Sequence, residues 1–570
     1  MKKKFLFAFT LISSYLINAQ QALYIPDTLS GTSFNLSIKD TSHVFYNGFI
    51  SNTHGINASY LGPTLLLNKG DSVSIQINNQ LMDTSTIHWH GMHVSPMNDG
   101  GPHNYILPGS TWNPQFRVRD NASLYWYHPH LHMMTEKHVT LGAAGMVIVR
   151  DSAEAALNLP RQYGIDDFPL VIQTKCFDNN KQIVVGTASD SIVMVNGTIN
   201  PFLSVPAQVV RLRLLNASTQ RVFNFGLTGN KAFSQIGADG GLLNQPVNLT
   251  RLRLSPGERA EILVDFSGMS GQSIYLFSFA SELPSATYGA TQPGMGPGQT
   301  IPGYSSNVLN GSNFSVIQFQ VAPPTSSAVT SIPGSLIVNT PFAVSSATTN
   351  RILTFSPIAM GPNALNGGFL INNTSFDMNI INYTIPKDNV EIWTLNNQSP
   401  IAHPFHLHDV QFYITEVNGA TPPANLQGRK DVVLVPAMQT VKFITKFETF
   451  CDDQMPYMYH CHMLPHEDGG MMGQFIVQCP PANSINDLSQ KGTKVFPNPF
   501  NEKLLIDHSS TINTIRIIDI TGRIVLEKLM NYAIDTIEIN TNELQTGTYL
   551  LITSGKGNTS KCIIQKSDNR

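Results

Sequence analysis

Charged residues are scarce in this sequence, and they are not gathered into a basic or acidic segment. Only 13% of the 570 residues are Asp, Glu, Lys or Arg, and the formal net charge is −3. After Lys2, Lys3 and Lys4 no basic run occurs, so the sequence lacks the electrostatic footprint of a nucleic-acid-binding protein. We therefore expect no nucleic acid among its partners.

Long apolar segments are also missing. The longest, residues 5–17, follows the three lysines and precedes the small residue Ala19, which is the pattern of a secretory signal peptide. It is too short to span a bilayer comfortably, and no other segment comes close. We predict a signal peptide over residues 1–19 and a mature chain that has no transmembrane segment.

Cysteine is rare and forms no CxxC pair. The five cysteines are odd in number, which leaves at least one of them without a disulfide partner. Because an exported protein can form disulfides, we predict that Cys451 pairs with Cys479, with Cys176 or Cys562 as the alternative partner. Cys461, which lies between two histidines, is expected to remain a thiolate.

Long amphipathic helical patterns are absent, whereas apolar and polar residues alternate with period two along much of the chain. Residues 72–77 and 209–215 are examples, and Gly, Pro and Asn bound such runs, as expected for strands with one buried face. The sequence therefore predicts an all-β protein made of several sandwiches. The boundaries follow lapses in the pattern: signal peptide 1–19, β-domains 33–150, 165–325 and 350–480, linker 481–494, and a small C-terminal β-sandwich 495–570.

Histidine is missing from the middle of the chain. All 17 histidines lie outside residues 139–402, so the second predicted β-domain contains none. Histidines used only for packing or surface polarity would not avoid one of three similar domains. The chemistry of the protein is therefore expected in the first and third domains.

Most of these histidines form four short clusters. On a strand, residues i and i+2 point to the same face, so an HxH pair can present two imidazoles to one metal region. Cys461 lies between His460 and His462 and points to the opposite face, so one strand can serve two metal sites. The clusters are His88-Trp89-His90, His128-Pro129-His130, the run from His403 through His406 to His408, and the run from His460 to Met471.

The types of ligand favour copper. One Cys, two His and a weak axial Met are the ligands of a blue-copper site, and Cys461 is followed by His466 and Met471 at spacings of five and ten residues. Zinc prefers a closed tetrahedral set of Cys and His ligands, which would leave the other histidine clusters unexplained.

Around these clusters the sequence resembles the multicopper oxidase family, over residues 33–479. The resemblance rests on HWHGMHVSPMNDGGPH, YWYHPHLH, LGAAGMVIV, RLRLLNAS, GADGGLL and GRKDVVLV. It is closest to the branch of bilirubin oxidases, spore-coat laccases and bacterial copper-efflux oxidases. It implies three consecutive cupredoxin-like Greek-key β-sandwich domains. It also implies an enzyme that takes electrons from a substrate at one copper and reduces dioxygen to water at a three-copper cluster.

The resemblance implies a place for each of four copper ions. The type 1 copper would be bound by His403, Cys461, His466 and Met471. The type 2 copper would be bound by His88 and His406. The two type 3 coppers would be bound by His90, His128, His130, His408, His460 and His462.

Other residues near the clusters have open roles. His132 continues the period-two series after His130, and Met472 stands beside Met471 as an alternative axial ligand. Of the remaining histidines, His93, His103 and His138 are expected around the ligands, and His43, His54 and His508 at the surface.

Two acidic residues are candidates for moving protons. Reduction of dioxygen to water consumes protons, which neutral imidazole ligands do not readily supply. The resemblance implies that Asp99 and Glu467 relay them, because both match acidic positions that act this way in the family. The alternatives are a turn cap for Asp99 and a hydrogen bond to a ligand for Glu467. Together with Cys461, they are the candidate catalytic residues.

The reducing substrate is expected to meet the type 1 site. Copper-efflux oxidases carry a Met-rich insertion, and acidic and Met residues before the first type 1 histidine. Here residues 397–401 contain neither, and the insertion 281–314 holds one methionine, Met295. We therefore expect laccase-like oxidation of phenols, aromatic amines or bilirubin-type pigments. Oxidation of Cu(I), Fe(II) or Mn(II) and non-catalytic copper binding are the alternatives.

The C-terminal unit carries PNP at 497–499, TGR at 521–523 and GTY at 547–549. These segments resemble the C-terminal sorting domain of the type IX secretion system. The resemblance implies export through the periplasm to the cell surface or the medium, with the secretion machinery as a partner. A small adhesion or carbohydrate-binding sandwich is the alternative, although no aromatic platform for sugars is evident.

Overall fold

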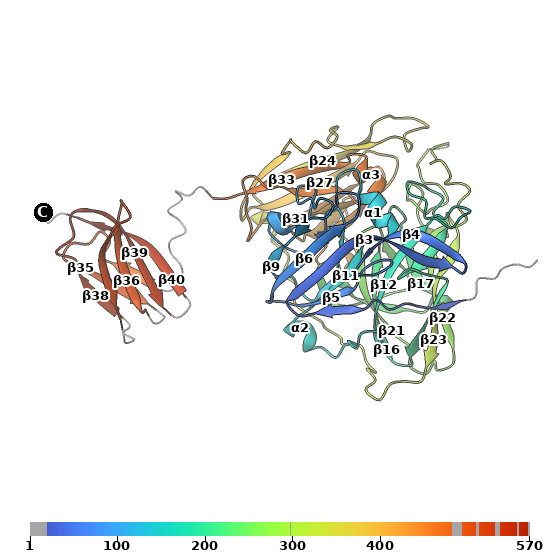
Figure 1. The fold of residues 1–570 in the computed structure, drawn as a ribbon, viewed down its shortest axis with the longest axis horizontal. Helices are drawn as coiled ribbons and strands as arrows, with labels where there is room; N and C mark the ends of the chain where they lie inside the picture. The colour runs from blue at the N-terminus through green and yellow to red at the C-terminus, as the bar shows by residue number, and fades with distance from the viewer. Residues whose placement is uncertain are drawn as a thin grey trace, which may run out of the picture. The chain divides into compact units, whose positions relative to one another are not determined.

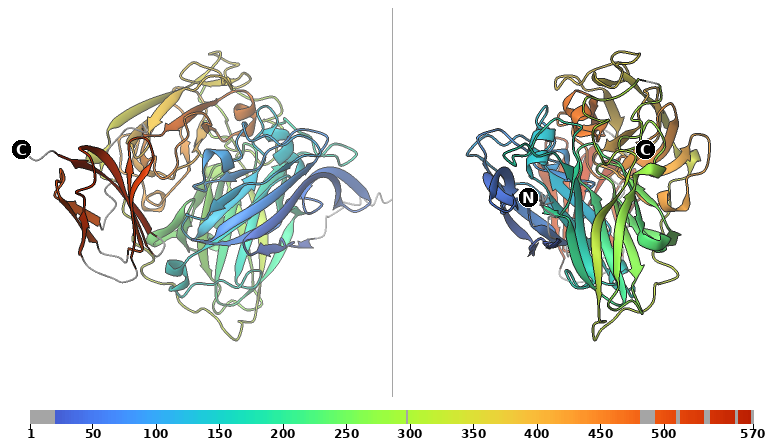
Figure 2. Two further views of the ribbon diagram at one scale, coloured as in Figure 1. Left: turned by 60° about the vertical axis from the view of Figure 1, so that its left-hand side comes forward. Right: turned by 90° about the vertical axis from the view of Figure 1, so that its right-hand side faces the viewer.

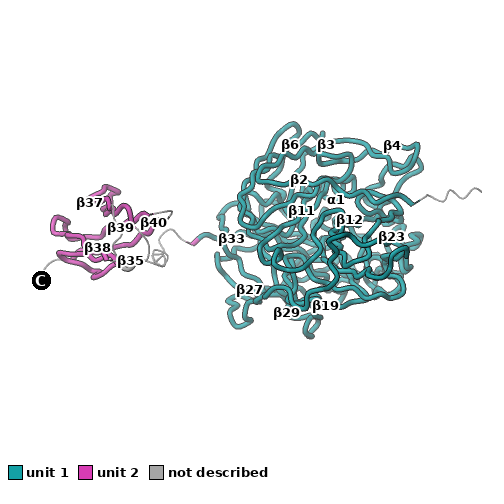
Figure 3. Tube along the Cα trace, turned by 90° about the horizontal axis from the view of Figure 1, so that it is seen from below, with its two compact units in different colours: residues 1–479 teal, residues 480–570 magenta. Residues whose placement is uncertain are grey.

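The computed structural model describes residues 20–296, 298–480, 493–508, 512–530, 536–555 and 558–567. The predicted signal peptide and residues 481–492 of the predicted linker lie outside these residues. The chain divides into two compact units, residues 1–479 and 480–570, drawn in teal and magenta in Figure 3. Both are built mainly from strands, so the predicted all-β class is confirmed.

The first sandwich of unit 1 has two sheets around one apolar core. In strand β6 the alternation predicted from the sequence is visible, because Val73, Ile75 and Ile77 are buried and the residues between them are more exposed. One sheet has the order β4 (Phe49–Ile56), β3 (Ser33–Tyr46), β6 (Ser72–Gln80) and β8 (Thr111–Trp112), with β9 (Gln115–Arg117) also paired to β6. The other has the order β2 (Thr28–Ser30), β5 (Thr64–Asn68), β11 (Gly145–Arg150), β10 (Ser123–His128) and β7 (His88–His90).

The second sandwich has the largest sheets of unit 1. Leu212, Phe225 and Phe319, from both sheets, lie in its common core. One sheet has the order β14 (Thr198–Ile199), β13 (Ile192–Val195), β12 (Asp167–Lys175), β16 (Val209–Asn216), β21 (Arg259–Asp265), β18 (Phe233–Ala238) and β19 (Gly241–Leu249). The other has the order β1 (Gln21–Ala22), β15 (Pro201–Pro206), β23 (Asn313–Ala322), β22 (Ser273–Phe279), β17 (Phe223–Leu227) and β20 (Leu252–Leu254).

The third sandwich is built around a core of aromatic side chains that includes Trp393, Phe405 and Phe475. One sheet has the order β25 (Phe369–Ile371), β24 (Thr349–Pro357), β27 (Val390–Asn397), β31 (Thr440–Lys446) and β29 (Tyr413–Val417). The other has the order β26 (Tyr383–Pro386), β33 (Met472–Gln478), β32 (Tyr457–Cys461), β28 (His403–Leu407) and β30 (Val432–Val435). Figures 1 and 2 show the three sandwiches packed together, coloured in turn from blue through green to orange.

Short helices fill some connections of unit 1. The α-helices are α1 (Thr135–Leu141), α2 (Ser152–Ala155) and α3 (Leu464–Asp468). The 3₁₀ turns are η1 (Pro96–Asn98), η2 (Thr228–Asn230), η3 (Ala280–Glu282), η4 (Val344–Ser346) and η5 (Ala424–Leu426). No helix in the described part of the chain is long and apolar enough to cross a membrane.

Strand register places the predicted ligands side by side. In the first sandwich β7 and β10 are antiparallel, and His88 lies opposite His128. In the third sandwich β28 and β32 are antiparallel, and His406 lies opposite His460. Because residues opposite each other in an antiparallel pair share one face, each ladder gathers imidazoles on a single face of its sheet.

The insertion 281–314 packs against the third sandwich. Tyr288 and Tyr304 are 1% exposed and belong to the core cluster of that sandwich. The backbone nitrogen of Ala402 donates a hydrogen bond to the carbonyl oxygen of Ala286 at 2.7 Å. Because Ala402 precedes His403, this insertion braces the start of strand β28.

The predicted disulfide between Cys451 and Cys479 is confirmed. The two residues are bonded, with a Cα–Cα distance of 5.0 Å and a sequence separation of 28. Cys176, Cys461 and Cys562 are free thiols. The bond ties the loop before β32 to the end of β33, and these two strands are neighbours in one sheet.

The C-terminal unit is a small sandwich with its own core, which includes Leu504, Ile517 and Ile564. One sheet has the order β34 (Thr493–Phe496), β35 (Lys503–His508) and β38 (Thr536–Asn540). The other has the order β37 (Ile524–Leu529), β36 (Thr514–Asp519), β39 (Gly547–Gly555) and β40 (Asn558–Lys566).

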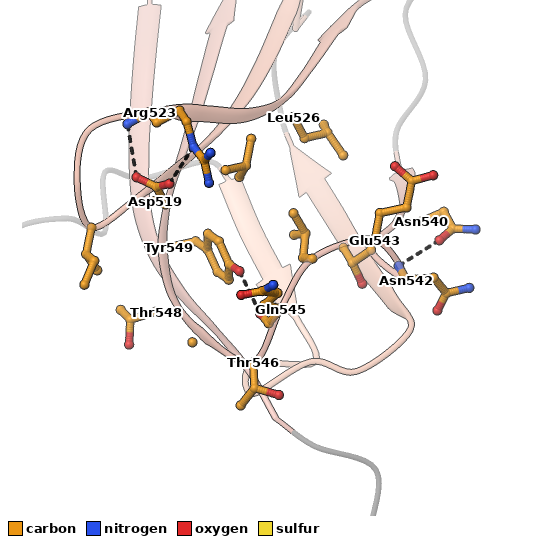
Figure 4. A pocket seen from close by; sticks show the side chains of 15 residues that line it. Asp519, Arg523, Leu526, Asn540, Asn542, Glu543, Gln545, Thr546, Thr548 and Tyr549 are labelled. Carbon is orange, nitrogen blue, oxygen red and sulfur yellow. Dashed lines mark hydrogen bonds and ion pairs between the residues drawn. The ribbon is translucent and has the colours of Figure 1, made fainter.

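Two of the sequence motifs of this unit meet at one open groove of about 910 Å³ (Figure 4). Arg523 of the TGR motif forms an ion pair with Asp519 at 3.1 Å. Tyr549 of the GTY motif donates a hydrogen bond to the carbonyl oxygen of Gln545 at 2.7 Å. The motifs thus shape two turns that line the same groove.

Candidate metal centre

The predicted copper ligands gather in two buried clusters within unit 1. One cluster combines eight histidines from the first and third sandwiches, and the other combines two histidines with Cys461. Within each of the following groups, the candidate ligand atoms lie within 4.8 Å of one another. The groups are His88 with His90 and His406, His90 with His128 and His462, His130 with His408 and His460, and His403 with Cys461 and His466.

In the eight-histidine cluster, ring nitrogens from the two sandwiches face each other directly. His130 Nε2 lies 3.0 Å from His460 Nε2. His88 Nε2 lies 3.4 Å from His406 Nε2. The partners in these contacts are more than 300 residues apart in the chain, so only the packing of the first sandwich on the third brings them together.

Three histidines of the first sandwich are held as neutral imidazoles. Burial lowers the pKa of His90, His128 and His130 well below the ordinary value, and neighbouring histidines lower it further. A neutral imidazole offers a lone pair, which is the form that binds a metal ion. Imidazole lone pairs that converge in a buried space suit copper among the transition metals, so the residues fit copper.

The second ring nitrogen of four ligands is occupied by a backbone carbonyl. In each case the Nδ1 atom donates the hydrogen bond, which leaves the Nε2 lone pair free for a metal. The donors and their acceptors, at 2.9 to 3.0 Å, are His88 with Asp99 O, His406 with Asp431 O, His128 with Pro129 O, and His460 with Cys461 O.

His90 is oriented the other way round. Its Nε2 atom lies 3.1 Å from the carboxylate Oδ1 of Asp431, while its Nδ1 atom lies 3.3 Å from Nε2 of both His128 and His462. Arg259, from the second sandwich, holds both carboxylate oxygens of Asp431, at 2.5 and 2.6 Å. Asp431 therefore fixes the proton of His90 on Nε2 and frees Nδ1 for a metal.

Asp99 contacts two of the predicted ligands and is buried with them. Its Oδ2 atom accepts a hydrogen bond from His408 Nδ1 at 2.8 Å, and its Oδ1 atom lies 3.5 Å from His88 Nδ1. Burial by itself raises the pKa of Asp99, but His408 and His88 outweigh it and hold the pKa below its ordinary value. Asp99 is therefore ionised and orients both rings.

Glu467, in α3, contacts another pair of ligands. Its Oε1 atom lies 3.4 Å from His130 Nδ1, and its Oε2 atom lies 3.3 Å from His460 Nδ1. Burial, followed by repulsion from Asp468, raises the pKa of Glu467 well above its ordinary value. The two predicted acidic residues thus stand beside the same cluster with pKa values shifted in opposite directions.

The second cluster surrounds Cys461. Its Sγ atom lies 3.4 Å from His403 Nδ1 and 3.6 Å from His466 Nδ1, and these two nitrogens are 3.2 Å apart. Ser399 Oγ lies 2.7 Å from His403 Nε2 and accepts a hydrogen bond from it. Burial raises the pKa of the Cys461 thiol, so a bound cation is what would stabilise the thiolate.

Met471 is the better placed of the two axial candidates. It is fully buried in the same core cluster as Cys461, whereas Met472 does not belong to that cluster. The backbone of Met471 accepts a hydrogen bond from Cys461 N at 3.0 Å and donates one to His466 O at 2.9 Å. Met472 instead pairs with His460 in the ladder between β32 and β33.

The other histidines lie outside both clusters. His132 packs against Phe376, with ring centres 5.0 Å apart, and belongs to none of the ligand groups in the described residues. His93 is hydrogen-bonded to Asp409, and His103 Nε2 lies 2.8 Å from Gln474 Oε1.

The prediction that His54 lies at the surface is wrong. It is 6% exposed and stacks edge-on against the buried His138, at 5.5 Å between ring centres. Its Nδ1 atom lies 3.0 Å from Oδ1 of Asp40, a half-exposed residue of β3. The side chain of His508 lies outside the described residues.

Sequence reasoning did not find Asp431, Arg259 or Ser399. Each acts on a ligand through a hydrogen bond or through another side chain, and no spacing in the sequence links it to that ligand. A weak indication was available for Arg259, since it begins a strand with the apolar run Ile262 to Val264, and an arginine buried in such a strand requires a partner.

Comparison with known proteins supports this picture over most of the chain. A model described as multicopper oxidase matches residues 38–154, a second matches residues 159–294 and a third matches residues 342–480. A model described as a secretion system C-terminal sorting domain matches residues 494–566.

Two kinds of relative are similar to the chain at comparable identity. Multicopper oxidase mco of Staphylococcus haemolyticus is 33% identical, over 78% of this chain and 88% of the relative. Cell division protein FtsP of Escherichia coli is 31% identical, over 80% of this chain and 93% of the relative.

Solved structures of similar proteins include a bacterial laccase-like multicopper oxidase CueO from Ochrobactrum sp. It is 30% identical, with a TM-score of 0.70, over 80% of this chain and 100% of that one. The multicopper oxidase of Campylobacter jejuni, described as a metallo-oxidase, is 25% identical with a TM-score of 0.67, over 81% of this chain and 96% of that one. By these matches, the chain belongs to the multicopper oxidase family and ends in a secretion sorting domain.

Proposed function

We propose that this chain is a copper-dependent oxidase that binds four copper ions and reduces dioxygen with electrons from a small reducing substrate. The observation that supports this most strongly is the completeness of the ligand set, since ten histidines and Cys461 gather in two buried clusters. The proposed type 1 ligands are His403, Cys461, His466 and Met471. The proposed ligands of the other three ions are His88 and His406 for type 2, and His90, His128, His130, His408, His460 and His462 for type 3.

Strand β32 gives the two clusters a short connection. Cys461 belongs to one cluster, while His460 and His462 on either side of it belong to the other. Copper ions at these positions would take single electrons from a substrate and deliver four of them to dioxygen. The chain contributes a buried covalent link between the clusters and keeps bulk water away from it.

Glu467 is the proposed proton donor to the eight-histidine cluster. Both of its carboxyl oxygens are buried and make no well-aligned hydrogen bond within the described residues, yet they lie beside His130 and His460. Such a carboxyl group can pass a proton toward the cluster and take another from water. Asp99 accepts a short hydrogen bond from His408. We propose that it orients this ring and so keeps the path of protons to the cluster clear.

The surroundings of the Cys461 cluster favour an aromatic substrate. His466 is the partly exposed ligand of this cluster, and the ring of Phe369 packs 4.4 Å from its ring. Asn397 and Ser399, which precede His403, are buried. Their side chains form hydrogen bonds with each other and with nearby carbonyl oxygens. They therefore offer no ligands to an incoming metal ion, and we propose laccase-like oxidation of phenols or related aromatic compounds.

Two other functions remain as alternatives, each tied to an observation. The relative from Campylobacter jejuni is described as a metallo-oxidase, so oxidation of Cu(I), Fe(II) or Mn(II) is the alternative reaction. The relatives named FtsP raise the alternative of copper binding without catalysis. The complete ligand set argues against the second, because storage does not need a cysteine between two histidines that belong to another cluster.

Oxygen uptake by the copper-loaded full chain separates these functions. We expect uptake with a phenolic dye to be faster than uptake with Cu(I), because the buried Asn397 and Ser399 before His403 offer no ligands to a metal ion. Faster uptake with Cu(I), Fe(II) or Mn(II) would identify a metal-ion oxidase. No uptake with any of these reductants, in protein that contains copper, would contradict the proposed oxidase.

Substitution of the proposed type 1 cysteine tests the copper assignment. Cys461→Ser should abolish the intense blue absorption and reduce turnover at least ~100-fold, while the other three coppers remain bound. The matched control is Cys176→Ser, which removes a free thiol far from the clusters in sequence and should keep the blue colour. A blue Cys461→Ser protein would rule out Cys461 as the type 1 ligand.

Substitution of Glu467 tests the proton donor. Glu467→Gln keeps the shape and burial of the side chain but cannot release a proton. We expect reoxidation of the reduced enzyme by dioxygen to slow about 100-fold, while reduction by substrate is little changed. Glu136→Gln is the control, because Glu136 is a nearby half-buried acid that contacts no predicted ligand. Equal rates for the wild-type and Glu467→Gln proteins in both half-reactions would leave Glu467 an orienting role alone.

We further propose that the chain crosses the periplasm and that its sorting unit is then removed. All predicted copper ligands precede residue 472, and unit 1 closes with the disulfide at Cys479. The mature protein should therefore run from about residue 20 to about residue 490 and keep full activity. Mass spectrometry of the native protein checks this, and a periplasmic chain that retains residues 495–570 would refute it.

A further inference from the structure

Apart from the copper clusters, unit 1 contains a cationic pocket of about 280 Å³ between the first and third sandwiches. Loops after β5 and β9 form one wall, and residues next to β29, β30 and β31 form the other. Five basic side chains line it, and they are Lys69, His93, Arg119, Arg429 and Lys446. Two acidic side chains also line it, and they are Asp120 and Glu448.

Two arginines of this pocket have no anionic partner. Within the described residues, Arg119 and Arg429 form neither an ion pair nor a side-chain hydrogen bond, and the Nε atom of Arg429 is buried without an acceptor. Each guanidinium lies against an aromatic ring instead, Arg119 at 5.4 Å from the ring centre of Phe450 and Arg429 at 5.3 Å from that of Tyr413. The Nε donor of Arg429 is therefore buried but unused, and Arg119 presents its donors to solvent.

The acidic residues of the pocket do not neutralise these charges. Glu448 is engaged by Lys446 at 2.9 Å. Asp120 accepts a hydrogen bond from the backbone nitrogen of His93 at 3.0 Å. Lys69 donates to the neutral amide oxygen of Asn121 at 2.6 Å. The pocket thus keeps an excess of positive charge.

His93 adds a buried donor at the same place. Its Nδ1 atom donates to the carbonyl oxygen of Asp409 at 2.7 Å and lies 3.0 Å from the carboxylate of that residue. Burial alone lowers the pKa of His93, but Asp409 and Asp120 outweigh it and raise the pKa to about 9. The ring is therefore protonated at neutral pH, and its Nε2 atom is buried without an acceptor.

We infer that this pocket binds a small oxyanion that carries more than one negative charge, such as inorganic phosphate or a di- or tricarboxylate. Buried donors without acceptors are rare in proteins because each costs the desolvation of its group. An oxyanion supplies acceptors to the imidazole and to the guanidinium groups together, and planar guanidinium groups match the geometry of carboxylate and phosphate oxygens. The inference goes beyond the proposed oxidase function, because no predicted copper ligand lines the pocket.

Titration calorimetry on the copper-loaded full chain tests the site, with inorganic phosphate and citrate as probes and chloride as the comparison at equal ionic strength. We expect saturable binding of phosphate, citrate or both at one site per chain, and no comparable binding of chloride. Arg119→Gln combined with Arg429→Gln should weaken that binding at least about tenfold, because two charge-assisted hydrogen-bonding groups are lost.

The matched control is Arg117→Gln. Arg117 is an exposed arginine in β9, two residues before Arg119, and it does not line the pocket. It should bind the probes as the wild type does. Unchanged blue absorption and thermal unfolding show that each variant is folded, and if the double variant fails this check the exposed Arg119→Gln alone carries the test.

Each outcome of this experiment has a defined meaning. Tighter binding of phosphate than of citrate assigns the pocket to phosphate compounds, and the reverse order assigns it to polycarboxylates. Absence of saturable binding, equal binding of chloride, or equal weakening by Arg117→Gln would overturn the inference.

Discussion

The gathering of ten imidazoles in the interior is the constraint on which this structure depends. Ring nitrogens of the eight-histidine cluster face one another at 3.0 to 3.4 Å in the buried interior. Unpaired polar atoms in such a place are costly, so each ring needs one fixed partner and one direction that is left to a metal. Three features of the fold meet this requirement. They are the strand ladders, the backbone carbonyls at the second ring nitrogens, and the carboxyl groups of Asp99, Asp431 and Glu467. The first and third sandwiches must pack against each other in one fixed orientation, because neither contains enough histidines to form the eight-histidine cluster alone.

The second sandwich contributes to the site without supplying a ligand. Its Arg259 holds Asp431, and Asp431 fixes the proton of His90. Lys430, next to Asp431, forms ion pairs with Asp239 at 2.9 Å and with Glu258 at 2.9 Å, both from the second sandwich. Buried ion pairs are weak evidence for stability, but they are exacting in geometry. Their effect here is to fix the third sandwich against the second, and through Asp431 to choose which nitrogen of His90 faces the cluster.

The features that could be predicted from the sequence are those with a short period. Alternation at two residues places His88 beside His90 and puts Cys461 and His460 on opposite faces, because strand geometry follows from the backbone alone. The disulfide could be predicted because Cys451 and Cys479 flank the last strands of one sandwich. The role of Asp431 could not, since Arg259 lies 172 residues away from it and only the packed fold brings them together. The burial of His54 was missed for the same reason, because its environment is set by α1 rather than by its neighbours in the chain.

The two clusters differ in access to solvent, and this difference orders the proposed reaction. Every ligand of the eight-histidine cluster is buried, whereas His466 is partly exposed. In the proposed reaction, a reducing substrate would therefore approach His466 but would not touch the cluster at which dioxygen would be reduced. Electrons must then pass through Cys461 and its flanking histidines, since that strand is the direct covalent connection between the two sites. The carboxyl groups follow the same division, because Asp99 and Glu467 both stand at the buried cluster, where protons are consumed, and neither contacts the ligands around Cys461. His466 alone would meet the substrate, whereas the eight histidines, Asp99 and Glu467 are buried. In the proposed reaction, this separation would keep partly reduced oxygen away from the substrate.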